Sequence, residues 1–288
     1  MLLHMNVNKI ALITGCSSGF GYLIALKFAR NGITTFASVR NLNSEGALQL
    51  KGIADKENLP LEIIKIDVTN DESVKKGVEY IIQKSKRLDI LINNAGVGYY
   101  GPVEEFSMEE IQSQYDINVL GAIRTVKAVT PFMRRQKKGL IINVSSVAGL
   151  VTFPLYGLYS SSKYALEALT DALAFELKPF GIKVCIVEPG SFDTKFRNNV
   201  KISSDNPEKS YTALKSKFIS KYESAHNSKI YRKFKNPQAV ADLTYSITNQ
   251  QNPKLRYPAG AEAYLFPILR KLIPDNLWLK LLSFLYEW

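Results

Sequence analysis

The chain contains 288 residues, of which 46% are apolar and 22% are charged, with a formal net charge of +11. This is ample for one large core, and the absence of a repeating period excludes solenoid and other repeat architectures. The only cysteines are Cys16 and Cys185, which excludes a disulfide framework and favours a reducing, cytoplasmic compartment. The two histidines stand apart from each other, so no metal site is expected.

Short apolar runs predict buried β-strands, with helix-like stretches between them. The expected strands are Ile10–Ile13, Thr34–Val39, Leu61–Ile66, Leu88–Ile92, Leu140–Val144 and Ile182–Val187. Continuous apolar strands that alternate with helices are typical of a parallel sheet covered on both faces. The predicted fold class is therefore α/β, a Rossmann-type doubly wound sheet forming a single domain over residues 1–288. Such a sheet binds its ligand beyond the carboxyl ends of the strands.

A glycine-rich turn follows the first predicted strand and precedes a helix-like stretch from Tyr22 to Arg30. The turn reads Thr14 to Gly21 with the spacing G-x-x-x-G-x-G, which differs from the familiar G-x-G-x-x-G fingerprint. Glycines allow the backbone to approach a pyrophosphate, and the amino end of a helix attracts its negative charge. We expect a phosphate cradle here, with a plain surface turn as the alternative.

The end of the second predicted strand indicates which nicotinamide cofactor is preferred. No Asp or Glu stands between Cys16 and Glu45, whereas Arg40 follows the strand directly. An acidic residue near this point binds the ribose 2′-hydroxyl of NAD, and an arginine can neutralise the 2′-phosphate of NADP. NADP(H) is therefore expected, with Ser38 and Asn41 as further contacts. The alternative is that Arg40 stacks on the adenine or lies in solvent, with NAD(H) accepted as well.

A serine, a tyrosine and a lysine are spaced as a proton-transfer site. Tyr159 and Lys163 are four residues apart, which places them on one face of a helix, and Ser146 stands thirteen positions before Tyr159. Tyr-x-x-x-Lys also occurs at Tyr80/Lys84, Tyr211/Lys215 and Tyr231/Lys235, where the residue thirteen positions upstream is not a serine. Only the copy at Tyr159 follows an apolar strand that ends in Ser146.

With these motifs, the chain resembles the short-chain dehydrogenase/reductase family, whose further motifs follow in order along nearly the whole chain. They are Asp67-Val68, Asn93-Asn94-Ala95-Gly96, Asn118, and Pro189-Gly190 followed by Thr194. The resemblance implies four catalytic residues, Asn118, Ser146, Tyr159 and Lys163. It also implies a cofactor site made by Gly15, Ser17, Ser18, Gly19, Phe20, Gly21, Arg40, Asn41, Asp67, Val68, Asn94, Ala95, Gly96, Tyr159, Lys163, Pro189, Gly190 and Thr194.

The resemblance also implies a role for each catalytic residue. Tyr159 would exchange a proton with the substrate oxygen, Ser146 would orient that oxygen, Lys163 would bond the nicotinamide ribose, and Asn118 would hold a water molecule. Lowering a tyrosine pKa from about 10 to about 7 requires about 4 kcal/mol. A unit positive charge at about 4 Å in an effective dielectric of about 20 supplies about 4 kcal/mol. Lys163 therefore suffices in magnitude, although burial opposes the phenolate.

Two carboxy-terminal segments are expected to determine the substrate. Residues 191–235, the predicted substrate lid, carry eleven Lys or Arg against four Asp or Glu. This excess could favour an anionic substrate, or it could be a solvated face; nucleic acid is not expected, since no recognition motif accompanies the charge. Residues 254–288 form an apolar extension without a run long enough to span a membrane. This extension could cover a substrate pocket, contact another subunit or lie at a membrane surface.

The lid and the extension resemble the hydroxysteroid and retinol dehydrogenase branch of the family. We therefore expect an NADP(H)-dependent oxidoreductase that interconverts a carbonyl and a secondary alcohol on a bulky apolar, steroid-, retinoid- or lipid-like substrate. The alternatives are a reductase of small polar ketones or sugars and a non-catalytic NADP(H)-sensing protein. The family resemblance implies a homodimer or homotetramer.

Overall fold

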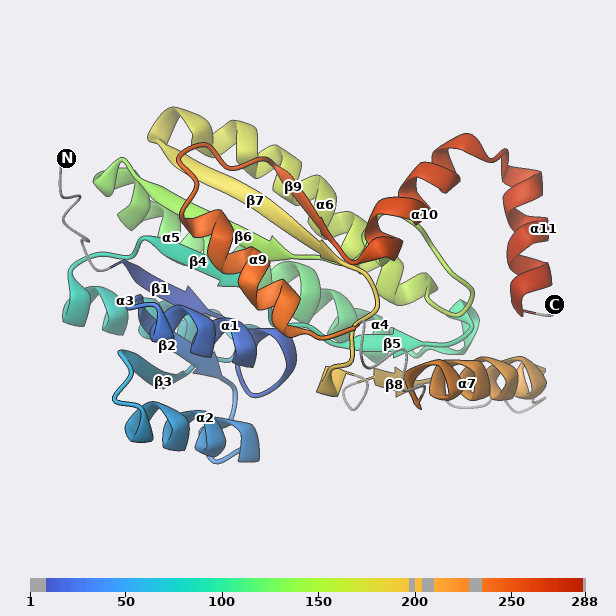
Figure 1. The fold of residues 1–288 in the computed structure, drawn as a ribbon, viewed down its shortest axis with the longest axis horizontal. Helices are drawn as coiled ribbons and strands as arrows, with labels where there is room; N and C mark the ends of the chain where they lie inside the picture. The colour runs from blue at the N-terminus through green and yellow to red at the C-terminus, as the bar shows by residue number, and fades with distance from the viewer. Residues whose placement is uncertain (1–8, 197–199, 204–209, 228–234, 287–288) are drawn as a thin grey trace.

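The structure, a computed structural model, describes residues 9–196, 200–203, 210–227 and 235–286, with only the backbone described for 221–227. A seven-stranded parallel sheet in the order β3-β2-β1-β4-β6-β7-β9 runs through its centre (Figure 1). The strands are β1 Ile10–Ile13, β2 Thr34–Val39, β3 Leu61–Lys65, β4 Ile90–Asn93, β6 Gly139–Val144, β7 Ile182–Pro189 and β9 Arg256–Ala259. All six predicted strands are confirmed: β1 and β2 have the predicted bounds, and the ends of the other four differ by at most two residues. The chain first builds outward from β1 to β3 and then returns to place β4 beside β1, so the order reverses between these two strands.

Helices cover both faces of the sheet, as the sequence predicts (Figure 1). One face packs against α1 (Gly19–Arg30), α2 (Glu45–Lys56) and α9 (Gln238–Thr248). The other packs against α3 (Asp71–Ser85), α5 (Gly121–Gln136) and α6 (Gly157–Leu177). Successive side chains of β1 serve the two cores in turn: Ala11 and Ile13 belong to the first, Ile10 and Leu12 to the second. Two-sided burial therefore explains why this strand is apolar throughout.

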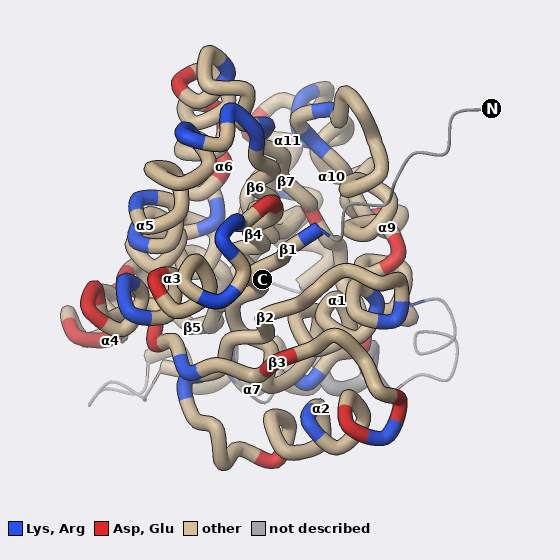
Figure 2. The backbone as a smooth tube through the Cα atoms, turned by 90° about the vertical axis from the view of Figure 1, so that its left-hand side faces the viewer, with Lys and Arg blue, Asp and Glu red and all other residues tan. Residues whose placement is uncertain are grey.

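Capping side chains mark the amino ends of two helices, and the charged residues lie mostly on the outer helices. The side chain of Asn70 caps α3, and Ser107 and Glu110 form a capping box at α4 (Met108–Tyr115). A π-helical segment, η2 (Asp116–Leu120), joins α4 to α5. Short 3-10 turns occupy η1 Val103–Glu105, η3 Val147–Gly149 and η4 Lys178–Phe180. Lys, Arg, Asp and Glu gather on the outer helices, such as α3, α4 and α5, and are sparse in the central strands (Figure 2).

Three strands were not predicted from the sequence. β5 (Gly98–Tyr100) and β8 (Val200–Ile202) pair in parallel as a second, two-stranded sheet. β9 contains Pro258, which lacks a backbone N–H, and it pairs only with β7 at the edge of the main sheet. These strands are short and not uniformly apolar, so their hydrophobic pattern does not stand out from that of loops.

The predicted lid, residues 191–235, lies partly outside the described residues. Its described part contains β8 and α7 (Thr212–Asn227). The Lys215 ammonium on α7 lies 2.7 Å from the Glu105 carboxylate in η1, and both side chains are buried. Ser203 Oγ donates a hydrogen bond to the same carboxylate. The basic segment is therefore attached to the main domain through a buried ion pair as well as through β8.

The chain ends in two helices, α10 (Ala261–Leu272) and α11 (Asp275–Tyr286), which form an arm beside the domain (Figure 1). Trp278 and Leu282 of α11 are buried with Val151. Within the described residues, no helix is long and apolar enough to cross a membrane.

Candidate active site

A cavity of about 950 Å³ opens at the carboxyl ends of the strands. It is lined by nearly all of the residues predicted to bind the cofactor or to catalyse. These residues are Gly15, Ser17, Ser18, Gly19, Phe20, Arg40, Asp67, Val68, Asn94, Ala95, Gly96, Ser146, Tyr159, Lys163, Pro189, Gly190 and Thr194. Gly21, Asn41 and Asn118 were predicted as well but do not line the cavity. Motifs far apart in the chain thus meet at one site, as a doubly wound sheet requires.

The glycine turn lies against the loop that follows β4, where Asn94 donates two hydrogen bonds to Thr14. Thr14 Oγ1 accepts hydrogen bonds from the backbone N–H groups of Asn94 and Ala95, and Asn94 Nδ2 donates to the Thr14 carbonyl. Gly15 adopts φ +72°, and a Cβ there would lie 2.7 Å from Ala95 Cα. A Cβ at Gly21 would lie 2.4 Å from Asn94 Nδ2. Gly21 therefore serves close packing of the turn rather than the cavity wall.

The turn leads into the amino end of α1, which has no side-chain cap and no acidic residue in its first turn. Its first N–H groups therefore meet no competing carboxylate from the helix itself, and the helix dipole favours an anion there. A second close approach supports the turn, since a Cβ at Gly46 of α2 would lie 1.7 Å from the Ser17 carbonyl oxygen. The sequence analysis missed Gly46, for which only proximity in the fold gives a signal.

Directly after β2, Arg40 lines the cavity and is exposed. Among the described residues, no carboxylate forms an ion pair with it. Asn41 is placed differently, because its Oδ1 accepts a hydrogen bond from the Asn43 backbone N–H. The buried hydroxyl of Ser38 is likewise not part of the wall. Asp67 lines the cavity while its carboxylate accepts from the N–H and the hydroxyl of Thr69.

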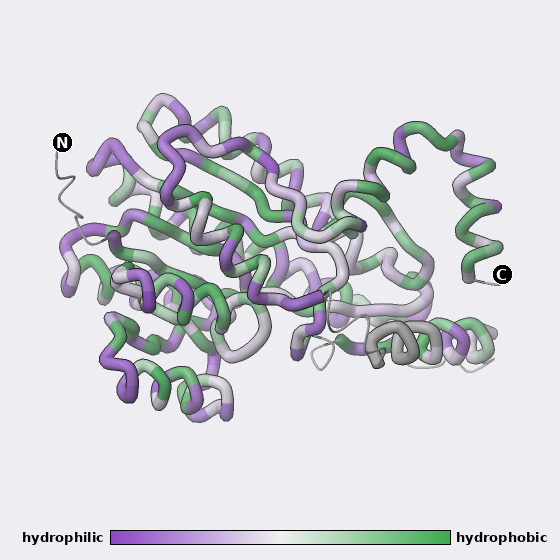
Figure 3. The backbone as a smooth tube through the Cα atoms, viewed as in Figure 1, coloured by the Kyte–Doolittle hydropathy of each residue, from purple (hydrophilic) through white to green (hydrophobic). Residues whose placement is uncertain are grey.

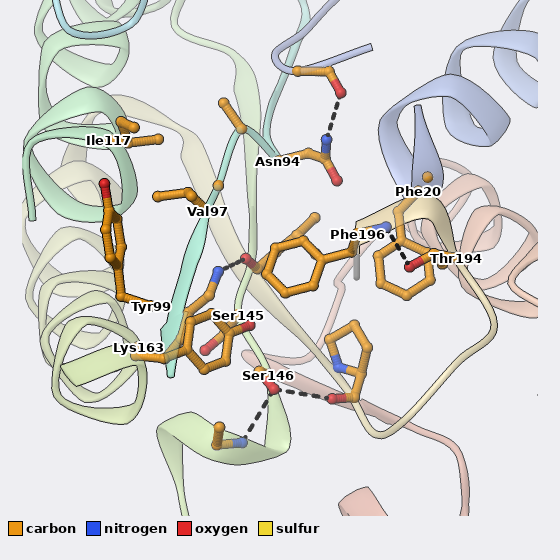
Figure 4. Close-up of a pocket in the computed structure, with 18 of the residues that line it drawn as sticks. Phe20, Asn94, Val97, Tyr99, Ile117, Ser145, Ser146, Lys163, Thr194 and Phe196 are labelled. Carbon is orange, nitrogen blue, oxygen red and sulfur yellow. Dashed lines mark hydrogen bonds between the residues drawn. The ribbon is translucent and has the colours of Figure 1, made fainter. Parts of the chain in front are cut away.

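Tyr159 and Lys163 lie side by side on the first turns of α6, which the Ser-rich sequence Gly157–Lys163 begins. Lys163 Nζ lies 5.8 Å from the centre of the Tyr159 ring and donates a 2.9 Å hydrogen bond to the Val144 carbonyl at the end of β6 (Figure 4). Burial lowers the pKa of Lys163 to about 8, against a smaller opposing effect of the Glu167 carboxylate. The lysine thus carries most of its positive charge at neutral pH, next to the phenol.

Ser146 lies at the start of η3, directly after the strand. Its Oγ accepts a hydrogen bond from the Ala148 N–H and lies 3.5 Å from the Pro189 carbonyl oxygen (Figure 4). Because the Pro189 contact is long and the hydroxyl lines the cavity, Ser146 retains a donor that can be directed at another acceptor.

Asn118 lies in the π-helical segment η2 and is 2% exposed. Its amide bonds the backbone of Val97 in both directions and donates to Ser162 of α6. A Cβ at Gly96 would lie 3.4 Å from Asn118 Oδ1 and 3.9 Å from Lys163 Nζ. The asparagine and the lysine thus approach the same glycine, although the asparagine is not part of the cavity wall. A π-helical turn contains one more residue than an α-helical turn, so it changes the direction of the side chains that follow. This segment directs Asn118 toward Val97 and Ser162.

A wall of aromatic side chains, which we call the aromatic wall, surrounds Tyr159. Tyr100 stacks on Tyr156 with ring centres 4.2 Å apart, and both rings lie edge-on to Tyr159. Phe196 lies tilted against Tyr159 at 5.9 Å. The aromatic wall consists of Tyr99, Tyr100, Phe153, Tyr156, Phe196, Phe266 and Tyr286; Phe20 and Phe192 line the cavity as well. Phe266 and Tyr286 belong to the extension 254–288, which was expected to cover a substrate pocket or to have another use. The rings from β5 and from the segment after β7 were not predicted, because no shared motif connects those segments.

Two other Tyr-x-x-x-Lys copies make ion pairs or surface bonds. Tyr80 and Lys84 both bond the Glu62 carboxylate. Tyr211 bonds Glu104, and Lys215 bonds Glu105. The copy at Tyr231 and Lys235 falls largely outside the described residues. Neither pair that can be compared lines the cavity.

The fold is a doubly wound α/β domain, and Tyr159 and Lys163 lie near each other in the cavity at the carboxyl ends of its strands. The profile described as short chain dehydrogenase matches residues 9–205. A 3-ketodihydrosphingosine reductase from Bacteroides thetaiotaomicron is 36% identical over 275 residues, which span 93% of this chain and 94% of that protein. Retinol dehydrogenase 16 from Rattus norvegicus is 33% identical over 280 residues, 94% of this chain and 86% of that protein.

Solved structures show the same architecture. A short-chain dehydrogenase from Streptomyces avermitilis matches with a TM-score of 0.79 and 29% identity, over 96% of this chain and 95% of that one. A gluconate 5-dehydrogenase from Burkholderia cenocepacia, in complex with NADP and tartrate, matches with a TM-score of 0.62 and 26% identity, over 72% of this chain and 79% of that one. The chain belongs to the short-chain dehydrogenase family. It is therefore an oxidoreductase.

Proposed function

We propose that the protein is an NADP(H)-dependent oxidoreductase that interconverts a carbonyl and a secondary alcohol on a bulky apolar substrate. The observation that carries this proposal is the position of Tyr159, which shares one cavity with Lys163, the glycine turn and the aromatic wall. Tyr159 and Lys163 would supply proton transfer, the glycine turn would hold the phosphates, and the aromatic wall would give the substrate an apolar surface.

The residues present fit a nicotinamide dinucleotide. Gly15 and Gly21 keep the turn free of Cβ atoms where the chain comes closest to Ala95 and Asn94, and the amino end of α1 is uncapped. Arg40 supplies a cation where a 2′-phosphate would lie, which is the reason to prefer NADP(H) over NAD(H). When bound, the nicotinamide supplies or accepts the hydride.

The side chains of the site would perform the proton chemistry. Tyr159 would donate a proton to the substrate oxygen in reduction and accept one in oxidation. Lys163, held by the Val144 carbonyl, would favour the phenolate by its charge. Ser146 would direct its hydroxyl at the same substrate oxygen. Asn118 would fix the loop at Val97 and hold a water molecule near Lys163.

The aromatic wall supports a bulky apolar substrate. Aromatic rings contribute large apolar contact areas, and here they lie directly around the proposed proton donor. The names of two relatives, a 3-ketodihydrosphingosine reductase and a retinol dehydrogenase, denote lipid ketone and alcohol substrates. Residues 191–235 would act as the lid over this substrate, and residues 254–288 would extend the wall through Phe266 and Tyr286.

We further propose a cytoplasmic homodimer or homotetramer that contacts membrane surfaces through α10 and α11. The location is supported by the two cysteines, which are both free thiols and buried. Oligomerisation would use the helices that carry Asn118 and Tyr159. The membrane contact is supported by the apolar exposed arm.

The test is consumption of NADPH, and of NADH in parallel, with ketosteroids, retinal, an acyl-dihydroxyacetone phosphate and small ketones as substrates. We expect turnover of a bulky apolar compound that Tyr159→Phe abolishes without weakening NADPH binding. Tyr80→Phe, at a Tyr-x-x-x-Lys copy on the surface, should keep full activity. Normal turnover by Tyr159→Phe would remove it as proton donor. Activity on small polar ketones alone would discard the apolar substrate, and NADPH binding without any turnover would favour a sensor.

A further inference from the structure

An ionic cluster with two buried carboxylates, Glu167 and Glu188, lies one helical turn beyond Lys163. Glu167 follows Lys163 by four residues on α6 and is 4% exposed. Arg256 reaches it from β9, with one guanidinium nitrogen 3.5 Å from Glu167 Oε2 and 2.8 Å from Asp171 Oδ1. Another nitrogen of the same guanidinium lies 3.3 Å from Glu188 Oε1. One arginine thus connects α6 with the last buried strand of the sheet.

The same cluster contacts the loop that carries Ser146. A Cβ at Gly149 would lie 2.8 Å from Ser145 Oγ and 3.1 Å from Glu167 Cγ, so this glycine leaves room for the two side chains to approach. Ser145 stands between Val144, whose carbonyl accepts from Lys163, and Ser146. Its hydroxyl is buried beside the Glu167 carboxylate, and its hydrogen bonding lowers the pKa of that group. Glu188 directly precedes Pro189, the neighbour of the Ser146 hydroxyl.

Three elements place ionisable side chains near Glu167, namely α6, β7 and β9. Lys163, Tyr164 and Asp171 stand on α6, Glu188 on β7 and Arg256 on β9, whereas η3 presents only Val147, Ala148 and Gly149. Burial raises the pKa of Glu167 to about 7, against a lowering by the Ser145 hydroxyl; the Glu188 and Asp171 carboxylates also raise it, and Arg256 lowers it. Burial likewise raises the pKa of Glu188 to about 6. Glu167 therefore changes its charge close to neutral pH.

We propose that Glu167 is a positioning residue of the catalytic centre, which supports the positive charge of Lys163 and holds the Val144–Ser146 loop against α6. Its ionised carboxylate favours the charged form of the lysine, and Arg256 favours the ionised carboxylate. Arg256 thus acts on the lysine through Glu167. The inference rests on the proposed function only in taking Lys163 as the catalytic lysine.

The test is a direct titration of Lys163, which needs no substrate. Protein labelled with ¹³C at the lysine ε-carbon is followed by NMR against pH, and Lys163→Met assigns the signal. In Glu167→Gln, which keeps the side-chain shape, the Lys163 midpoint should fall by about one pH unit, the order expected for removing an opposite charge nearby. Glu176→Gln, an exposed glutamate on the same helix, should leave it unchanged.

Arg256→Gln provides the second variant if Glu167→Gln does not fold. Without the guanidinium, Glu167 should retain its proton to higher pH, and the Lys163 midpoint should again fall. An unchanged midpoint in a folded variant of either kind overturns the proposal. The alkaline limb of the turnover profile should move with the NMR midpoint. If Tyr159→Phe remains active, the proposed function fails, whatever the Glu167 variant shows. If Tyr159→Phe is inactive but the Lys163 midpoint does not move in the Glu167 or Arg256 variant, only the present inference fails.

Discussion

Arg40 is the residue on which the proposed cofactor preference depends, because it is the cation at the cavity end of β2. Arg40→Asp would replace the partner of a 2′-phosphate with a carboxylate that repels it and can bond a 2′-hydroxyl. Hydrogen bonds to charged groups contribute about 1.5–3 kcal/mol. We therefore expect NADPH affinity to fall by about 10- to 100-fold relative to NADH. Binding of both cofactors by fluorescence titration measures this, with Arg135→Asp on α5 as the control. Unchanged relative affinities would take Arg40 out of the site.

Glu167 gives a prediction for stability, because its pKa is raised from 4.5 to about 7 by burial. Between these values the unfolded state releases the proton while the folded state keeps it, so the folded protein loses stability as pH rises through this window. Glu167→Gln does not titrate. The variant should match the wild type at pH 5 and be more stable at pH 8 by up to about 3 kcal/mol, at 1.36 kcal/mol per pKa unit. Urea unfolding at pH 5 and pH 8 measures the free energy of unfolding of the variant and of the wild type. If the variant differs from the wild type by the same amount at both pH values, the prediction is wrong.

At the scale of single residues, the sequence predicted what short motifs encode. Gly15, Arg40, Ser146, Tyr159 and Lys163 each stand at a strand end or on a helix face that the local pattern defines. The sequence could not predict Glu167 and Arg256, because their pairing depends on β9 coming to lie beside β7. It predicted Asn41 for the cavity, but the side chain closes a local turn with Asn43.

At the scale of elements, β1 to β7 of the main sheet were predictable because burial on both faces makes them continuous apolar runs. β5 and β8 were not, because strands of three residues with Gly98 or Lys201 among them carry no such pattern. The aromatic wall was only partly foreseen, through the extension 254–288, for a related reason: its rings come from β5, the segment before α6, the segment after β7, and α10 and α11. These elements meet only once the sheet is formed.

Helix α7 gives a prediction at this scale, because the Lys215–Glu105 pair attaches it to η1. Lys215→Met would leave the buried Glu105 carboxylate without the lysine ammonium, and breaking a buried pair from one side costs about 3–5 kcal/mol. We expect faster amide exchange in α7 and a higher KM for a bulky substrate, with NADPH affinity unchanged. The double variant Lys215→Met/Glu105→Gln should recover part of the loss, since the buried negative charge is removed together with its lysine partner. A KM equal to that of the wild type, with protected α7 amides, would show that the pair does not hold the helix.

At the scale of the whole molecule, the exposed apolar surface is unevenly distributed. The arm formed by α10 and α11 is mostly apolar along its length (Figure 3). It carries side chains that are each more than half exposed, namely Tyr264, Leu265, Ile268, Leu272, Leu277, Leu279, Phe284 and Leu285. Lys271 and Lys280 are exposed on the same helices, and the chain carries +11 overall. Apolar side chains beside cations suit the surface of an anionic membrane.

The arm also connects that surface with the active site, because Phe266 of α10 and Tyr286 of α11 line the cavity. On the proposed function, an apolar substrate would enter the cavity from the side of the arm, past Phe266 and Tyr286. Leu272→Glu and Phe284→Glu should each weaken binding to phosphatidylserine-containing vesicles by about tenfold or more, since a buried Leu or Phe contributes about 1.5–3 kcal/mol. Leu48→Glu, at an exposed leucine of α2, is the matched control.

Vesicle co-sedimentation measures the binding, and light scattering measures the mass of the same variants without lipid. We expect anionic vesicles to bind the wild type more tightly than phosphatidylcholine vesicles, and added salt to reduce that preference, because the lysines act through screened charges. The opposing result is that the two glutamate variants bind vesicles as the wild type does but form a smaller oligomer by light scattering. That result would show that a second copy of the chain, and not a membrane, covers the arm. In that case the substrate would enter from water, and KM for a lipid-like substrate should not change when vesicles are added.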